Sequence, residues 1–552
     1  MTIEQAAAGP APGRSQAAPH PLGGSGAVPG ERGADIHDVA IVGFGPSGAV
    51  AAALLGQAGL RVCVLDRQHE VYDKPRAIAL DHEILRVFQQ LGIVEQVEPF
   101  MEPFTDSCYY GVDGDLIRRM TMVAPPYPQG YTPSVVFTQP PVEEVLRAAV
   151  RALPNVTVVT GQAVFDLGQD EHVRLACRDE AGAIATVDAR YVIGCDGASS
   201  TVRELAGIRL TDLGFDEPWL VVDVMANERG LAKLPTTSVQ YCEPERPCTY
   251  VMGPGNHRRW EISLKDGEDP KAIVEDAATW ALLSRWLTPE DGQLWRQAAY
   301  RFHALVAERW RAGRVFIAGD AAHQQPPFLG QGMCQGVRDV ANLCWKLTAV
   351  LRGDVTGSAA DALLDSYGDE RRAHVTDLTT RLKAVGAVIC ERNVKAARAR
   401  DRQMLSDAVD GQVAPTPRQD VLPQLRTGLL AKSITAARGS LCPQPWLLKD
   451  GARVRMDTVL GSGWRLLVTA NADLGEPTPL HVDTLGLRVL KFGEGPGRVA
   501  EAEGVMAHWF EARRCRAALV RPDNYVFGTA TNAAGLQALL DEAALHLHGM
   551  AA

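Results

Sequence analysis

Apolar runs near the start of the chain are separated by a glycine-rich turn and a stretch of small residues. Residues 39–42 are apolar, residues 43–48 read Gly-Phe-Gly-Pro-Ser-Gly, and residues 49–57 predict a helix. A second, mostly apolar run covers residues 60–65 and ends at Asp66. This order of strand, turn, helix, strand and acid has the spacing that dinucleotide binding requires.

The chemistry of such a turn explains its composition. Backbone N–H groups and the positive end of a helix face a pyrophosphate there, and glycine lets the backbone come close to it. Asp66 is placed to accept hydrogen bonds from an adenosine ribose. A glycine-rich turn can also be a simple connection between a strand and a helix, so the rest of the chain has to decide between the two.

The remaining pattern predicts a mixed α/β protein. Predicted strands cover residues 156–190 (antiparallel), 191–195, 220–264, 315–318, 464–468 and 517–520, and predicted helices cover residues 141–152, 270–286, 332–351, 359–395, 500–513 and 535–547. Residues 405–450 contain several prolines and predict a linker. The pattern after residue 454 is that of a separate small α/β unit.

Composition narrows the class of protein. The 552 residues are 46% apolar and 22% charged with a formal net charge of −10, and no basic block predicts a nucleic-acid partner. The 11 cysteines contain no C-x-x-C pair, which is typical of a reducing compartment. Residues 1–35 have no continuous apolar segment and predict a disordered tail without a signal peptide. We therefore expect a cytoplasmic protein with no membrane partner, and a homodimer is the assembly to test.

Two later segments have features that fit the same kind of ligand as the first turn. One apolar strand ends at Asp196-Gly197, and its simpler interpretation is a helix start capped by Ser199 or Ser200. Another ends at Gly319-Asp320, where an acid can reach a ribose or ribityl hydroxyl. It is followed by Pro326-Pro327 and by a second possible cradle of backbone N–H groups at residues 330–333. Ordinary turn chemistry readily explains one such segment. It explains three of them in the same chain much less readily.

Six stretches together carry a resemblance to a known family: residues 74–78, 137–140, 196–197, 319–320, 337–347 and 367–372. They resemble the single-component (class A) flavoprotein aromatic hydroxylases, which have the para-hydroxybenzoate hydroxylase fold. The resemblance covers nearly the whole chain after the tail, and within the family it is greatest for the 3-(3-hydroxyphenyl)propionate hydroxylases. These stretches are specific for the family and much less so for the substrate.

The resemblance implies an α/β fold with three parts. A Rossmann-like FAD-binding domain would comprise residues 36–105, 139–215 and 300–400, and an inserted β-sheet substrate domain would comprise residues 106–138 and 216–299. A linker at residues 401–450 would lead to a thioredoxin-like domain at residues 451–552. Cys442 and Cys515 stand alone, so a structural or assembly role is expected for this domain and its motif at residues 521–526.

The resemblance also implies the cofactors, FAD and NADPH or NADH, and the residues that bind FAD; no metal is expected. The implied FAD-binding residues are Gly43, Gly45, Pro46, Ser47, Gly48, Asp66, Arg67, Arg76, Gln139, Asp196, Gly319, Asp320, Pro327, Gly330, Gln331, Gly332 and Met333. Arg76 and Gln139 have simpler interpretations, a surface ion pair and a helix cap.

The implied reaction uses NAD(P)H to reduce FAD, and O2 then gives a flavin C4a-hydroperoxide that hydroxylates an activated aromatic ring. Pro326, Pro327, Phe328 and Leu329 fit the apolar wall that such a site needs. A phenol reacts faster as its phenolate, and the candidates for activating it are His303, Tyr241 and His323, each of which is more often structural.

The substrate is less defined than the reaction. An arylpropionate requires a cation for its carboxylate, and the candidates are Arg246, Arg258 and Arg259, the last two in a stretch, 258–261, that fits a buried network. A nitrocatechol (with nitrite release), a resorcinol or a polyketide are alternative substrates. A flavin-free binding module of related fold is the alternative from another class, and the complete set at residues 319–320 and 330–332 favours the enzyme.

Overall fold

The glycine-rich turn joins the first strand and the first helix of a mostly parallel sheet. We describe the protein from a computed structural model that covers residues 36–407, 413–470 and 472–548, so the predicted disordered tail lies outside the described residues. β1 (His37–Val42) leads into α1 (Pro46–Gln57), and β2 (Val62–Asp66) pairs with β1 in parallel. The predicted strand–turn–helix–strand order is therefore confirmed.

The parallel core of this sheet has the order β18–β11–β1–β2–β8. Its other strands are β8 (Val156–Thr160), β11 (Ile184–Gly194) and β18 (Val315–Ile317), while β9 (Ala163–Gln169), β10 (Val173–Arg178) and β17 (Arg311–Ala312) join it in antiparallel pairs. Residues 39–42 of β1 and all of β18 are apolar and buried because helices cover the sheet. The carboxyl ends of β1, β11 and β18 bring the three predicted segments to one edge.

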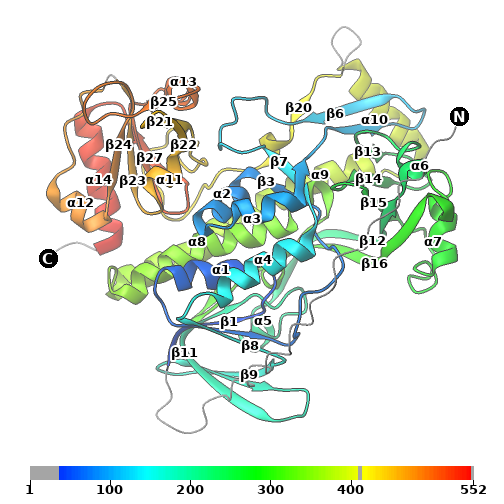
Figure 1. The fold of residues 1–552 in the computed structure, drawn as a ribbon, viewed down its shortest axis with the longest axis horizontal. Coiled ribbons are helices and arrows are strands. Elements are labelled where there is room, and N and C mark those ends of the chain that lie inside the picture. The colour runs from blue at the N-terminus through cyan, green and yellow to red at the C-terminus, as the bar shows by residue number, and fades with distance from the viewer. Residues whose placement is uncertain (1–35, 408–412, 471, 549–552) are drawn as a thin grey trace, which may run out of the picture. The chain divides into compact units, whose positions relative to one another are not determined.

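Helices from distant parts of the chain pack together beside this sheet. α1 contacts both α4 (Gln139–Arg151) and α8 (Gly332–Arg352), and α8 runs along α9 (Gly357–Ile389), as Figure 1 shows. α2 (His82–Leu91) contacts α8 as well. α1 and α8 both begin at the edge where β1, β11 and β18 end, and their first turns lie close together, as the approach of Ser47 to Gly336 shows.

A nine-stranded sheet forms the second layer, in the order β19–β16–β12–β15–β14–β13–β5–β6–β20. Its strands are β5 (Ser107–Tyr110), β6 (Leu116–Thr121), β12 (Leu210–Ala226), β13 (Ser238–Tyr241), β14 (Cys248–Met252), β15 (His257–Ser263), β16 (Gly292–Ala307), β19 (His323–Gln324) and β20 (Thr416–Pro417). β12 and β16 pair along their length and cross the boundaries predicted at 215/216 and 299/300. The predicted domain boundaries therefore fall inside continuous strands.

Two predicted helices of the first 400 residues differ from the structure. The predicted helix 359–395 is two helices, because α9 ends at Ile389 and Asn393 caps a new helix, α10 (Val394–Ser406), by accepting a hydrogen bond from the Ala396 N–H. Only α7 (Asp276–Leu283) forms within the predicted helix 270–286. Part of the predicted linker also belongs to the second sheet, since β20 pairs with β6.

The C-terminal unit is built on a four-stranded sheet in the order β24–β23–β26–β27. The strands are β23 (Arg465–Val468), β24 (Arg488–Lys491), β26 (Ala517–Val520) and β27 (Val526–Ala530), with α12 (Pro479–Leu485), α13 (Val505–Ala512) and α14 (Ala533–His548) around them. The predicted helix 500–513 begins only at Val505, after the short strand β25 (Ala500–Glu501). Burial raises the pKa of Cys442 and of Cys515 to about 12, so neither is a reactive thiolate at neutral pH.

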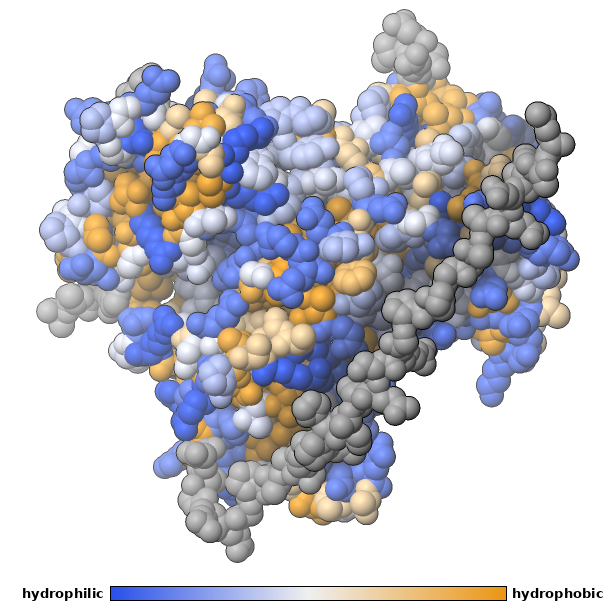
Figure 2. All heavy atoms as spheres, viewed as in Figure 1, coloured by the Kyte–Doolittle hydropathy of each residue, from blue (hydrophilic) through white to orange (hydrophobic). Residues whose placement is uncertain are grey.

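A buried ionic cluster connects this C-terminal unit to α8 and α9. Arg521 binds both Glu370 on α9 and Asp523, and Lys346 and Asn342 on α8 also bind Glu370. All five side chains are at least nine-tenths buried. On the face drawn in Figure 2, hydrophilic and hydrophobic residues are intermingled, and no helix in the part of the chain described could cross a membrane.

Candidate functional site

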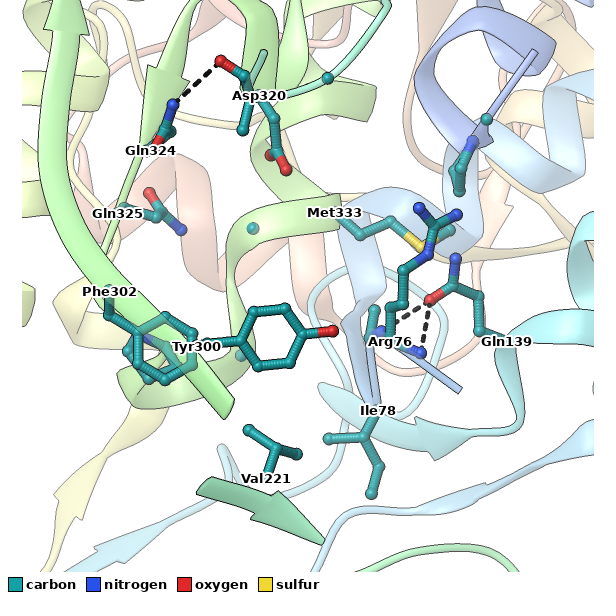
Figure 3. Close-up of a pocket in the computed structure, with 18 of the residues that line it drawn as sticks. Arg76, Ile78, Gln139, Val221, Tyr300, Phe302, Asp320, Gln324, Gln325 and Met333 are labelled. Atoms are coloured by element: carbon teal, nitrogen blue, oxygen red, sulfur yellow. Dashed lines mark hydrogen bonds between the residues drawn. The ribbon is translucent and has the colours of Figure 1, made fainter. Parts of the chain in front are cut away.

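A pocket of about 450 Å³ lies where the edge of the parallel sheet meets the second sheet (Figure 3). The three predicted segments converge on it. The predicted residues that line it are Gly45, Pro46, Ser47, Arg76, Gln139, Arg259, His303, Asp320, Pro327, Gly330, Gly332 and Met333. Those that line neither this pocket nor the smaller cavity beside it are Gly43, Gly48, Asp66, Arg67, Asp196, Tyr241, Arg246, Arg258, Gly319, His323 and Gln331.

Two helix N-termini supply the pocket with hydrogen-bond donors. The N–H groups of Ser47 and Gly48 lie in the first turn of α1, and those of Gly332 and Met333 lie in the first turn of α8, so none has an acceptor within its helix. Both helix dipoles place positive charge at the same pocket. This arrangement suits an anionic ligand such as a pyrophosphate.

The glycines of the first turn have separate functions. A Cβ on Gly48 would lie 1.9 Å from the carbonyl oxygen of Gly43, and a Cβ on Gly43, which has φ of +102°, would lie 2.4 Å from that of Cys195. These two glycines allow the turn to pack closely. A Cβ on Gly45 would meet no protein atom within 4 Å, and Gly45 lines the pocket. Gly45 therefore leaves room on the ligand side.

The Asp66 carboxylate lies against the turn. Its Oδ2 accepts a hydrogen bond from the Phe44 N–H at 2.5 Å and its Oδ1 accepts one from the Gln68 N–H at 2.7 Å. Arg67, which follows it, is exposed. Asp66 thus fixes the first turn to the end of β2, and its contact with an adenosine ribose stays a prediction.

Asp196 caps a short helix. Its carboxylate accepts hydrogen bonds from Ser200 Oγ at 2.5 Å and from the Val202 N–H at 3.0 Å, at the start of α5 (Thr201–Leu205). Ser200 is the N-cap and accepts from the Arg203 N–H. The Asp196 side chain therefore has the simpler of the two predicted roles, since it takes part in the start of a helix. The residues that line the pocket in this segment are Gly197 and Ala198.

The third segment contains two polar residues, Asp320 and His323, whose side chains have different surroundings. The Asp320 side chain points into the pocket (Figure 3), and its carboxylate accepts no hydrogen bond from any described residue. The side chain is open to the pocket, while desolvation by the protein around it raises its pKa. In contrast, His323 Nε2 lies 2.8 Å from Asp339 Oδ2, and its ring stacks on Trp310. Asp320 is free for a ligand, whereas His323 belongs to the core and does not line either cavity.

Gln139 holds the loop that carries Arg76. Its Oε1 accepts hydrogen bonds from the N–H groups of Arg76 at 3.2 Å and Ala77 at 2.6 Å, and its Nε2 donates to Glu143. Arg76 is half exposed, and its guanidinium lies 3.6 Å from Glu143. Gln139 therefore bridges a loop and a helix instead of capping the helix.

Arg259 also holds this loop. It makes two hydrogen bonds to Asp223, at 2.7 and 3.1 Å, and donates to the carbonyl groups of Pro75 and Arg76. Arg296 donates to the Pro75 carbonyl as well. The predicted buried network at residues 258–261 is present, but the donors of Arg259 are used within the protein.

Three other candidates lie away from the cavities. Arg246 is paired with Glu268 at 2.6 Å, and Arg258 donates to backbone carbonyl groups of its own hairpin. The hydroxyl of Tyr241 accepts a hydrogen bond from Trp286 Nε1 at 3.1 Å. Because strand residues alternate between faces, sequence alone did not show that these side chains would find partners elsewhere.

A smaller cavity of about 40 Å³ adjoins the pocket and shares Ile78, Glu261, Pro327 and Gly330 with it. Its floor is a row of polar side chains in register across four strands: Tyr109, Gln240, Thr249 and Glu261. Pro327, Phe328 and Leu329 line it as well, which places the predicted apolar wall here. Phe328 is fixed by edge-on contacts with Phe215 and Trp219.

Sequence reasoning missed several residues of the two cavities. Arg418, from the predicted linker, is buried in the smaller cavity, lies 4.4 Å above the Phe104 ring and donates to the Leu329 carbonyl. Its Nε has no hydrogen-bond partner, and it forms no ion pair with a carboxylate of the described chain. Tyr300 points across the larger pocket from β16 and stacks on Phe302, 5.9 Å between ring centres (Figure 3). No local pattern marks Arg418 in the sequence.

Comparison with known proteins defines the class. Residues 37–382 match the family described as FAD binding domain, and residues 439–545 match the HcaD C-terminal domain. Among solved structures, the flavin-dependent monooxygenase PieE in complex with FAD and substrate superposes with a TM-score of 0.78, at 24% identity over 93% of this chain and 99% of that one. p-Nitrophenol 4-monooxygenase PnpA from Pseudomonas putida DLL-E4 gives a TM-score of 0.62 at 27% identity, over 70% of this chain and 97% of that one.

Curated relatives extend along almost the whole chain. A probable NADH-specific resorcinol 4-hydroxylase of Rhodococcus jostii (strain RHA1) is 37% identical over 518 residues, 92% of this chain and 94% of the relative. A 3-(3-hydroxy-phenyl)propionate/3-hydroxycinnamic acid hydroxylase of Burkholderia cenocepacia (strain HI2424) is 32% identical over 524 residues, 90% of this chain and 94% of the relative.

The fold and the pocket define an FAD-binding flavoprotein. The free amides of two helix starts, the space at Gly45 and the unpaired Asp320 carboxylate fit that cofactor. The chain belongs to the FAD-dependent aromatic hydroxylases, enzymes that use a nicotinamide co-substrate. The predicted fold class, enzyme class and cofactors are confirmed.

Proposed function

We propose that FAD occupies the larger pocket and that the aromatic substrate lies where this pocket meets the smaller cavity, reaching into the smaller cavity, whose volume of about 40 Å³ is too small for the whole molecule. The first-turn amides of α1 and α8 would hold the FAD phosphates and ring, and Asp320 would accept hydrogen bonds from its sugar hydroxyl groups. The observation that carries this proposal is the convergence of three distant segments on one pocket beside a small, partly polar cavity.

The chemistry supplied by FAD, when it is bound, is uptake of a hydride from NAD(P)H and transfer of an oxygen atom from O2 to the ring. The protein's own contribution is to position the ring and to exclude water. Pro327, Phe328 and Leu329 provide the apolar side of the smaller cavity. Arg259 and Arg296 keep the loop at residues 75–76 in place through its carbonyl groups.

We propose a 3-(3-hydroxyphenyl)propionate-type substrate, as in one of the relatives. Arg418 supports this choice, because a buried guanidinium without a carboxylate partner is costly and an anionic side group of the substrate would neutralise it. Arg418 thus takes the place that was predicted for Arg246 or Arg259. Resorcinol is the second candidate, since the relative with 37% identity is named for it, and that name also favours NADH over NADPH.

The test is a substrate screen of the purified, yellow enzyme. Oxidation of NADH and of NADPH would be followed with 3-(3-hydroxyphenyl)propionate, 3-hydroxycinnamate and resorcinol, and products identified by mass. A product that is one oxygen atom heavier than the arylpropionate supports the proposal. Exclusive turnover of resorcinol rejects the anionic substrate. Protein without flavin that takes up none when supplied would reject the whole assignment.

Arg418→Met separates the two substrates. The substitution should raise KM for the arylpropionate about 10-fold or more, because a charge-assisted hydrogen bond is lost. It should raise KM for resorcinol less. Arg246→Met removes an ion pair outside the cavities and is the matched control. Equal effects of Arg418→Met on both substrates would contradict the assignment.

The domain boundaries and the thioredoxin-like nature of residues 451–552 remain our proposals. We propose to move the boundaries at 215/216 and 299/300 to the ends of β12 and β16, which pair across both of them. We assign the C-terminal unit a structural role, supported by its buried thiols and by the ionic cluster that joins it to α9. A cytoplasmic location is supported by 11 cysteines without a disulfide. A homodimer would be tested by light scattering of the purified protein.

A further inference from the structure

Glu261 is a buried carboxylate between the two cavities. It lies on β15, is 9% exposed, and lines both the larger pocket and the smaller cavity. Its carboxylate takes part in no hydrogen bond or ion pair with another described residue, in contrast to its neighbour on the same face, Arg259. A buried acid without a partner inside the protein is unusual and suggests a partner that binds.

Strand register places Glu261 where a ligand can reach it. Glu261 is opposite Val221 on β12 and Thr249 on β14. Two residues earlier, Arg259 is opposite Asp223, which takes up that guanidinium through two hydrogen bonds. Thr249 in turn donates to Gln240. The neighbours of Glu261 are therefore committed to one another, and its carboxylate remains directed at the cavities.

Burial also makes Glu261 a group that exchanges protons near neutral pH. Burial raises its pKa to about 7, although Arg259 and Arg296 favour the charged form. The charged and titratable groups around it are Asp223 on β12, Arg259 on β15, Arg296 on β16 and Cys248 on β14, with Tyr109 and Arg418 on the lining of the smaller cavity. A base with this pKa suits proton transfer from a phenol.

We propose that Glu261 accepts the proton of the substrate's ring hydroxyl group in the smaller cavity. This inference rests on the proposed function. The O–H bond of the substrate breaks, the proton moves to a Glu261 carboxylate oxygen, and the electron pair stays on the phenolate oxygen, where it enriches the ring for attack. The other candidates are less well placed: His303 lines only the larger pocket, Tyr241 lines neither cavity, and His323 is bound to Asp339.

The test compares the wild type with Glu261→Gln, using product formed per unit time and per NADH oxidised. With an ordinary phenolic substrate, Glu261→Gln should lower the rate of product formation about 100-fold, the usual contribution of a general base. With a polyfluorinated analogue, whose hydroxyl is already ionised at the assay pH, the loss should be less than about 10-fold. FAD content, read from the flavin absorbance, checks that each protein is folded.

The pH profile of the wild type gives a second readout that needs no variant. Product formation from the ordinary phenol should fall as the pH is lowered through about 7, because protonated Glu261 cannot accept a proton, and the acidic analogue should lack this fall. Glu217→Gln is the matched control: this glutamate of β12 also has a pKa raised by burial but lines neither cavity. Its pH profile should match the wild type.

Three results would overturn the inference. They are an unchanged rate and pH profile in Glu261→Gln, an equal loss with the phenol and its fluorinated analogue, and a wild-type pH profile that does not depend on the acidity of the substrate. Failure of the proposed function would be visible earlier, as wild-type protein that holds no FAD or hydroxylates no phenol.

Discussion

Arg521→Met should weaken the attachment of the C-terminal unit to the FAD-binding part of the chain. Arg521 Nη2 donates to Glu370 Oε2 at 2.6 Å and Nη1 donates to Oε1 at 3.0 Å. Arg521 also donates to Asp523 and to the Leu429 carbonyl. Methionine keeps much of the side-chain volume and removes the charge and all of these donors.

The magnitude follows from the charges of the cluster. Arg521 and Lys346 balance Glu370 and Asp523, so removing Arg521 leaves one buried negative charge in excess. Arg521 and Glu370 are completely buried. Removing one partner of a buried ion pair costs about 3–5 kcal/mol, because the other charge stays in the interior without compensation. We expect a loss of at least about 3 kcal/mol in the free energy of unfolding.

The assay is denaturant unfolding followed by tryptophan fluorescence, since Trp345 and Trp464 pack edge to face where α8 meets the C-terminal sheet. Arg453→Met is the control, because Arg453 forms an exposed ion pair with Glu503 and such pairs contribute about 0–1 kcal/mol. If Arg521→Met destabilises the protein no more than Arg453→Met, the cluster does not stabilise the junction.

The same cluster predicts a dependence on pH. Burial opposes ionisation of Glu370, but Arg521 and Lys346 outweigh it and lower its pKa to about 2. A pKa lowered in the folded state stabilises the protein fully above the unfolded value of about 4.3, and this stabilisation is lost as the pH falls from there towards 2. The acid transition of Arg521→Met should be less steep in that range.

The remaining predictions concern the FAD pocket. Gly48→Ala should abolish FAD retention and destabilise the apoprotein, because its Cβ would lie 1.9 Å from the Gly43 carbonyl oxygen. Gly45→Ala should weaken FAD binding while leaving the melting temperature of the apoprotein unchanged, because its Cβ meets no protein atom within 4 Å; equal melting temperatures for the two variants would refute the distinction. Asp320→Ala should lower flavin occupancy, with a loss of about 1.5–3 kcal/mol in FAD binding for each charged hydrogen bond, measured by flavin absorbance after dialysis. Unaltered flavin content would show that Asp320 does not contact FAD.

Local patterns accounted for the elements of the parallel sheet. β1, the glycine turn, α1 and β2 are neighbours in the chain, and their fold follows from apolar runs, small helical residues and glycines at close contacts. The cavity-lining residues 45–47, 320, 327–330, 332 and 333 lie where strands end and helices begin, and the family resemblance drew attention to this stretch.

Partners far apart in the chain decided the rest. Whether an arginine on a strand is free or neutralised depends on which strand lies beside it, as Asp223 beside Arg259 shows. Arg418 reached the smaller cavity only because β20 pairs with β6, almost 300 residues away in the chain.

The sequence by itself determined the class of fold, because backbone conformation and hydrophobic periodicity are local properties, and the resemblance of its motifs to a known family indicated the cofactor. The tertiary structure decided which acid and which cation face the smaller cavity. Burial and the loss of competing partners give Glu261 and Arg418 their chemistry, and both arise only when distant strands pack together.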